Sequence, residues 1–255
     1  MNHCYELLVS TTTRALAATA LCMLSACAAE LESPIPTTTY AGSEAPARTL
    51  VVLLPGAGDR LGAYDEHGFV AAMRDAGLHV DLLEVDAHYG YYKARTLLDR
   101  MEQDVLAPNR GKYEEIWLVG ISMGGLGALL TAWIYPEDID GLILLAPYLG
   151  RRQTIKKIDN AGGLAQWQPP ASANDADWDV EIWRMLKRIS ESGGGPDLYL
   201  AYGEDDFGVR AHAVLANALP PSNVRTTAGG HAWTTWSTLW KELLADPAVR
   251  ADLEQ

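Results

Sequence analysis

Residues 115–130 read EIWLVGISMGGLGALL, and this stretch determines the expected fold. Its first half is an apolar run with β-branched members, which is typical of a strand buried on both faces of a parallel sheet. From Ser122 onward the pattern changes to small residues and leucines at helical spacing. Ser122 is therefore expected at a corner where a strand turns into a helix.

Two glycines, Gly120 and Gly124, flank Ser122 in the pattern G-x-S-x-G. Such a corner holds the serine in a strained backbone conformation with its hydroxyl pointing away from the sheet. Glycine is needed on both sides because the strand and helix backbones pass too close for a Cβ. An ordinary Gly-rich turn is the alternative, but the strand before and the helix after Ser122 favour a nucleophile.

On these residues the chain resembles the serine hydrolases of the α/β-hydrolase fold, and the resemblance covers nearly everything from Thr49 to the C-terminus. It implies a mostly parallel sheet of about six strands flanked by helices. The alternation of apolar runs with helical patterns agrees, because strands and helices that alternate build parallel sheets. Strands are expected at 49–54, 78–87, 115–121, 142–146, 198–202 and 223–227, with helices that include 68–76 and 94–105.

The regular alternation lapses after the strand that ends near Ala146. In related hydrolases an insertion at this place commonly forms a lid, so residues 150–196 are a possible small lid within a domain spanning 49–255. A long crossover connection is the equally weighted alternative. Several aromatic residues could line an acyl pocket, although aromatic residues more often belong to a core. None is assigned, and they are Tyr91, Tyr92, Tyr148, Trp167, Trp178 and Trp183.

A serine hydroxyl needs a base to become a nucleophile, and the base needs a carboxylate to orient it. In this fold the chain order is serine, acid, histidine, each at the carboxyl end of a strand. His231 meets both conditions because it follows the last expected strand, whereas His212 falls within an expected helix. A histidine that is merely packed or solvated is the alternative.

The acid is less clearly marked because Glu204, Asp205 and Asp206 are consecutive. Family members usually place the acid three residues after the glycine that ends the strand. That spacing from Gly203 selects Asp206, and Asp205 is the alternative.

The turn after the first domain strand reads Pro55-Gly56-Ala57-Gly58, where related enzymes usually have His-Gly-x-Gly. By position, the backbone N–H groups of Ala57 and Met123 would form an oxyanion hole. A plain Pro-Gly turn is the alternative.

The resemblance implies hydrolysis of small-molecule carboxylic esters through an acyl-enzyme intermediate, with Ser122, Asp206 and His231 as the catalytic triad. The same triad hydrolyses thioesters and amides, and a catalytically inactive binding module is a further alternative. No metal ion or organic cofactor is expected, since the chemistry needs none and no ligand motif is present.

The length of the chain indicates how many domains it forms, and its charge indicates which partners it can bind. The chain has 255 residues, 48% of them hydrophobic, which suits one enzyme-sized domain. Its formal net charge is −13, and no basic stripe interrupts the acidic residues. A nucleic-acid partner is therefore not expected.

The three cysteines, Cys4, Cys22 and Cys27, all lie at the beginning of the chain, so the domain has no disulfide framework. An apolar run, Ala15–Leu24, has the length of the apolar h-region of an export signal, and Leu24-Ser25-Ala26-Cys27 resembles the lipobox of bacterial lipoproteins. We expect residues 1–26 to be a signal peptide, Cys27 to carry a lipid anchor, and 27–48 to be a flexible tether. The protein would then be exported and membrane-anchored, facing the periplasm or the cell exterior. A simple secretory signal is the alternative.

Overall fold

The computed structural model describes residues 31–43, 45–171, 177–192 and 194–254. The chain divides into two compact units, 1–31 and 32–255, and the second carries the fold described below. The expected signal peptide and the lipidation site Cys27 lie outside the described residues.

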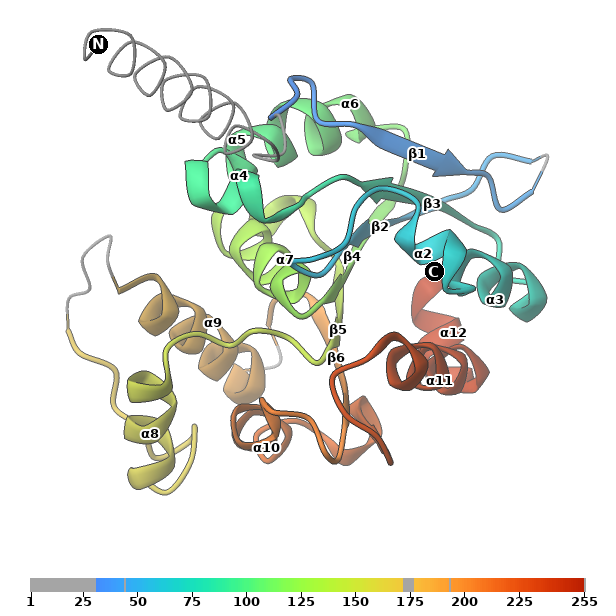
Figure 1. The fold of residues 1–255 in the computed structure, drawn as a ribbon. Helices are drawn as coiled ribbons and strands as arrows, with labels where there is room; N and C mark the ends of the chain where they lie inside the picture. Colours follow the sequence, from blue (N-terminus) through green and yellow to red (C-terminus); the bar gives the residue numbers. More distant parts are fainter. Residues whose placement is uncertain (1–30, 44, 172–176, 193, 255) are drawn as a thin grey trace, which may run out of the picture. The chain divides into compact units, whose positions relative to one another are not determined.

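The second unit is built on a seven-stranded sheet with the order β1-β3-β2-β4-β5-β6-β7 (Figure 1). Every neighbouring pair is parallel except β1 with β3. The chain is therefore a mostly parallel α/β structure, as the alternating sequence pattern predicts. The strands are β1 (Thr37–Tyr40), β2 (Thr49–Leu54), β3 (Val80–Val85), β4 (Glu115–Ile121), β5 (Gly141–Leu145), β6 (Asp197–Gly203) and β7 (Val224–Thr227).

The strand β1 corrects the expectation of a flexible tether over 27–48 and adds a seventh strand to the six expected. It pairs antiparallel with β3, with Thr37 opposite Val85. The Tyr40 hydroxyl also donates a hydrogen bond to Glu84 at 3.2 Å. The sequence does not predict β1, because this strand lies at the edge of the sheet and its threonines show no alternation of apolar and polar residues.

Helices cover both faces of the sheet. In Figure 1, α3, α11 and α12 lie together on one side and α7 and α9 on the other. The helices are α2 (Ala63–Glu66), α3 (Phe69–Ala76), α4 (Tyr89–Ala94), α5 (Leu97–Arg100), α6 (Ala107–Asn109), α7 (Met123–Ile134), α8 (Arg152–Asn160), α9 (Trp178–Ser192), α10 (Val209–Ala216), α11 (Trp233–Ala245) and α12 (Pro247–Leu253). A π-helical segment, Met101–Leu106, joins α5 to α6.

The single helix expected over 94–105 is interrupted near its start. Arg95 has a left-handed backbone with φ of 60°, so α4 ends there and α5 begins two residues later. The periodicity of the apolar residues could not reveal this break, because periodicity reports which face is buried and not whether the axis is continuous.

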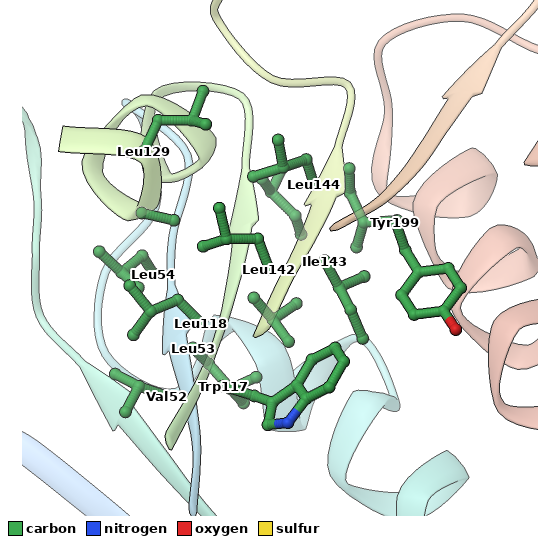
Figure 2. Close-up of a cluster of buried hydrophobic side chains, with 14 of the residues drawn as sticks. Val52, Leu53, Leu54, Trp117, Leu118, Leu129, Leu142, Ile143, Leu144 and Tyr199 are labelled. Atoms are coloured by element: carbon green, nitrogen blue, oxygen red, sulfur yellow. The ribbon is translucent and has the colours of Figure 1, made fainter. Parts of the chain in front are cut away.

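The core lies between the central strands and the helices on each face. Trp117, Leu118 and Leu142 are among its fully buried side chains (Figure 2). The ring of Trp117 stacks on Tyr199 with centroids 6.2 Å apart, which links β4 to β6 across β5. All residues of β2 and β5 are buried, as expected for central strands of a parallel sheet.

The segment 150–196 forms α8 and α9. Helix α9 packs on α7, and the Trp183 indole N–H donates to the carbonyl of Leu149 at 2.9 Å. Arg151 pairs with the buried carboxylate of Asp179 at the start of α9. Helix α9 is thus part of the core structure, and a mobile lid over 150–196 stays a prediction.

Replacing Leu118 by Ala removes buried apolar contacts at the centre of the sheet, where the side chain is 0% exposed. We expect the free energy of unfolding to fall by about 2–5 kcal/mol, measured by urea denaturation. Ile134→Ala is the control, because Ile134 is 42% exposed at the end of α7, and it should cost less than about 1 kcal/mol. Equal losses in the two variants would contradict this account of the core.

Candidate active site

Ser122 lies between the end of β4 and the start of α7, with φ of 52° and ψ of −110°. Such a conformation costs about 1–3 kcal/mol for a residue with a Cβ and must be imposed by its surroundings. Two backbone hydrogen bonds hold it: the Ser122 N–H donates to Leu145 at 3.0 Å, and the Ser122 carbonyl accepts from Tyr148 at 2.8 Å. The end of β5 and the loop after it therefore fix the serine.

The flanking glycines are required for steric reasons. A Cβ on Gly120 would lie 2.3 Å from the carbonyl oxygen of Gly124. A Cβ on Gly124 would lie 1.9 Å from the carbonyl oxygen of Leu54, at the end of β2. Any side chain at either position would push the strand and helix apart, so the corner depends on both glycines.

His231 and Asp206 meet Ser122 at the carboxyl edge of the sheet. Asp206 follows β6, and His231 lies in the loop between β7 and α11. The His231 Nε2 atom is 2.9 Å from the Ser122 Oγ, and its Nδ1 atom is 2.7 Å from the Asp206 Oδ2. With the proton on Nδ1 donated to the carboxylate, Nε2 is free to accept the serine proton. His231 is thus within hydrogen-bonding reach of both Ser122 and Asp206 and links them.

Asp206 is only 2% exposed, and its second oxygen, Oδ1, accepts the backbone N–H of Gly208 at 2.7 Å. Burial tends to raise the pKa of Asp206, but the hydrogen bonds from His231 and Gly208 outweigh it and hold this pKa below its ordinary value. The carboxylate is therefore ionised at neutral pH. The neighbouring Asp205 side chain is exposed, and it is Asp206 that contacts His231.

A second histidine, His212 on α10, lies behind the acid and was not assigned from the sequence. It is buried, and its Nε2 lies 3.0 Å from the carbonyl oxygen of Pro147, to which it can donate. Its Nδ1 lies 3.9 Å from the Asp206 Oδ1. Burial lowers the pKa of His212, so the ring is neutral at pH 7. The sequence places His212 in a helix, and a helical position alone does not show whether the side chain faces the site.

The two predicted oxyanion donors flank the corner. Met123 is the first residue of α7, and N–H groups in the first turn of a helix have no intrahelical partner. Ala57 lies in a turn closed by the Asp59 N–H to the Gly56 carbonyl at 3.2 Å. The close approach of Gly124 to the carbonyls of Leu54 and Pro55 brings this turn beside Ser122.

One pocket contains Ser122, and a second lies beside the corner at the next residue, Met123. The His231 pocket, of about 570 Å³, is lined by residues that include Ser122, His231, Phe207 and Arg210. The Met123 pocket, of about 500 Å³, is lined by Tyr89, Tyr92, Lys93, Arg95, Leu97, Leu98, Met123, Leu126, Leu130, Tyr148 and Trp178. Tyr148 lines both pockets.

Of the six aromatic residues left unassigned above, three thus line the Met123 pocket, namely Tyr92, Tyr148 and Trp178. The others, Tyr91, Trp167 and Trp183, are buried in the core. The exposed Phe207 was missed as well: it is 80% exposed, and its ring lies 4.4 Å from that of His231. Its position directly after the acid was the only available signal.

Within the described part of the chain, no group of three or more His, Cys, Asp or Glu side chains is arranged to hold a metal ion. The same residues include no helix with the length and apolar character that crossing a membrane requires.

A family profile described as serine aminopeptidase, S33, matches residues 45–174, about half of the chain. The chain belongs to this α/β-hydrolase family. The matched region includes the Ser122 corner and the Pro55–Gly58 turn, whereas Asp206 and His231 lie beyond it.

Among relatives of this α/β-hydrolase, an acetyl esterase from Caldicellulosiruptor saccharolyticus is 26% identical over 175 residues. The match covers 62% of this chain and 63% of the esterase, so it spans less than two thirds of that relative. An S-formylglutathione hydrolase from Staphylococcus aureus has a similar structure, with a TM-score of 0.56, 14% identity and 82% of each chain covered. Est1E from Butyrivibrio proteoclasticus has a TM-score of 0.53 and 17% identity, covering 85% of this hydrolase and 92% of its own chain. Both structures share the fold.

The lowered pKa of Asp206 predicts that the stability of the fold depends on pH. The ionised Asp206 carboxylate stabilises the folded state fully above the ordinary aspartate pKa of about 3.9, and this stabilisation is lost as the pH falls through the lower pKa of the folded state. We therefore expect the wild type to exceed Asp206→Asn in unfolding free energy at pH 6, and this difference to shrink below about pH 3.9. Urea denaturation at several pH values measures it, with Asp205→Asn as the control. A difference that stays constant down to pH 2.5 would contradict the assignment.

Proposed function

We propose that this α/β-hydrolase cleaves carboxylic esters through an acyl-enzyme intermediate, with Ser122 as nucleophile, His231 as general base and acid, and Asp206 as the orienting carboxylate. The observation that carries the proposal is the continuous hydrogen-bonded chain from Ser122 Oγ through His231 to Asp206, at a serine held in a left-handed conformation. The named acetyl esterase relative supports the choice of esters.

The geometry suggests the following steps. His231 Nε2 takes the proton of Ser122 as Oγ attacks the ester carbonyl, and the N–H groups of Ala57 and Met123 stabilise the resulting oxyanion. The imidazolium is stabilised by the ionised, buried Asp206. When the carbonyl re-forms, the bond to the alcohol breaks and His231 returns the proton to the leaving oxygen. Water, activated by the same histidine, then releases the acid and restores Ser122.

The family description raises the alternative of peptide cleavage at a free amino terminus. An aminopeptidase would be expected to hold the substrate ammonium group with a carboxylate. Among the described residues that line the two pockets, Asp206 is the only carboxylate, and it is already paired with His231. The cations lining the pockets are Lys93, Arg95, Arg152 and Arg210, of which Arg210 pairs with Asp159, and this favours esters over amino-terminal peptides.

Activity on p-nitrophenyl esters tests the proposal. Ser122→Ala should abolish turnover and labelling by a fluorophosphonate probe. Asp206→Asn should lower kcat about 10³-fold or more, because the histidine loses its orienting acceptor. Asp205→Asn is the matched control and should stay within about twofold of wild type, since its side chain is exposed. A folded protein whose Ser122 is not labelled would leave only a binding module, and exclusive turnover of thioesters or amides would redirect the substrate class.

We also propose that the protein is exported and lipidated at Cys27, on the strength of the sequence Leu24-Ser25-Ala26-Cys27 after an apolar run. Cys27→Ala in the full-length chain should move the protein from the membrane to the soluble fraction of an expressing bacterium and abolish incorporation of labelled palmitate. Cys22→Ala is the control and should change neither. Membrane recovery that is unaffected by Cys27→Ala would refute lipidation.

A further inference from the structure

The two pockets beside Ser122 differ in the group of the catalytic machinery that each contains. Ser122 and His231 line one, and Met123, the residue that follows Ser122, lines the other; Tyr148 lines both. Resting on the proposed function, we propose that the Met123 pocket binds the acyl part of the substrate, and that this acyl chain ends in an anionic group held by Lys93 and Arg95. The substrate class is then a half-ester of a dicarboxylic acid.

The direction of binding follows from proton transfer. The leaving oxygen must receive its proton from His231 Nε2, so the alcohol part has to lie on the side of His231. The carbonyl oxygen must point to the N–H of Met123. The remaining substituent of the carbonyl carbon, the acyl chain, then extends into the Met123 pocket.

The size of this pocket argues against a very short acyl chain. A volume of about 500 Å³ is in the range of pockets for drug-sized ligands, and a methyl group would leave most of it empty. Its lining includes the apolar side chains of Leu126 and Leu130 from α7. The Tyr92 hydroxyl donates to the Met123 carbonyl at 3.0 Å, which fixes the wall next to the corner. Such a lining suits a chain of several methylene groups.

Two of the residues that line the pocket are positively charged. Lys93 and Arg95 are exposed, and neither forms an ion pair or hydrogen bond through its side chain with another described residue. No Asp or Glu is among the described lining residues. In a chain with a net charge of −13, most described arginines pair with carboxylates, as Arg110 does with Glu102 and Asp138. Two uncompensated cations at a pocket attract an anion.

The backbone of Arg95 supports the same conclusion. Arg95 ends α4 in a left-handed conformation with φ of 60°, a position where glycine or asparagine is favoured. The Arg95 guanidinium has no ion-pair or hydrogen-bond partner among the described residues, so it is available to a ligand in the pocket it lines.

Two esters of equal length test the proposal: p-nitrophenyl hexanoate, which is neutral, and the mono-p-nitrophenyl ester of adipic acid, which ends in a carboxylate. We expect the wild type to prefer the adipate ester in kcat/KM. Lys93→Gln and Arg95→Asn should each lower the adipate-to-hexanoate ratio about 1.4- to fivefold, the range for exposed ion pairs. Arg95→Lys should keep most of the ratio. Added salt should lower it in the wild type and have less effect in the variants.

Lys112→Gln is the matched control, because Lys112 is exposed before β4, at the opposite end of that strand from Ser122. It should leave the ratio unchanged. Arg95→Asn should fold as stably as wild type, since asparagine tolerates the left-handed conformation, so a lower ratio would not reflect unfolding. Ratios that are equal in all variants, or faster turnover of p-nitrophenyl acetate than of hexanoate, would overturn this inference while leaving ester hydrolysis intact. Failure of Ser122 to react with fluorophosphonate would instead overturn the proposed function.

Discussion

The architecture of the site depends on one close approach between two backbones. The first turn of α7 passes so near the end of β2 that only a hydrogen atom fits on the Cα of Gly124. This contact places the Pro55–Gly58 turn next to Ser122 and holds the strand-to-helix corner in its strained form. The proposed nucleophile and the proposed oxyanion donors are thus positioned by a single steric constraint.

The parallel sheet supplies the rest of the arrangement. Ser122 and His231 are 109 residues apart in the sequence, and they meet because β4 and β7 present their carboxyl ends at the same edge. Asp206 arrives there from β6, between them. Apolar central strands buried on both faces keep this edge rigid, so three loops can hold side chains within hydrogen-bonding distance.

Local patterns and the family resemblance together pointed to the three side chains that the structure brings into contact. Ser122 is marked by its glycines and His231 by its place after the last strand, whereas Asp206 was chosen over Asp205 by the spacing usual in related hydrolases. Other features depend on tertiary structure and leave weak local signals. The polar edge strand β1 gains its stability from pairing with β3, and the break at Arg95 does not disturb the apolar periodicity. Which aromatic residues line a pocket depends on how helices pack, and no spacing encodes that.

Tyr148 is a wall of both pockets, and its N–H also bonds to the carbonyl of Ser122. In the proposed binding mode, one side chain therefore contacts both halves of the substrate. A smaller residue at this position, admitting a bulkier alcohol, would also enlarge the proposed acyl pocket. The two proposed selectivities are then coupled, because a single substitution at Tyr148 changes both.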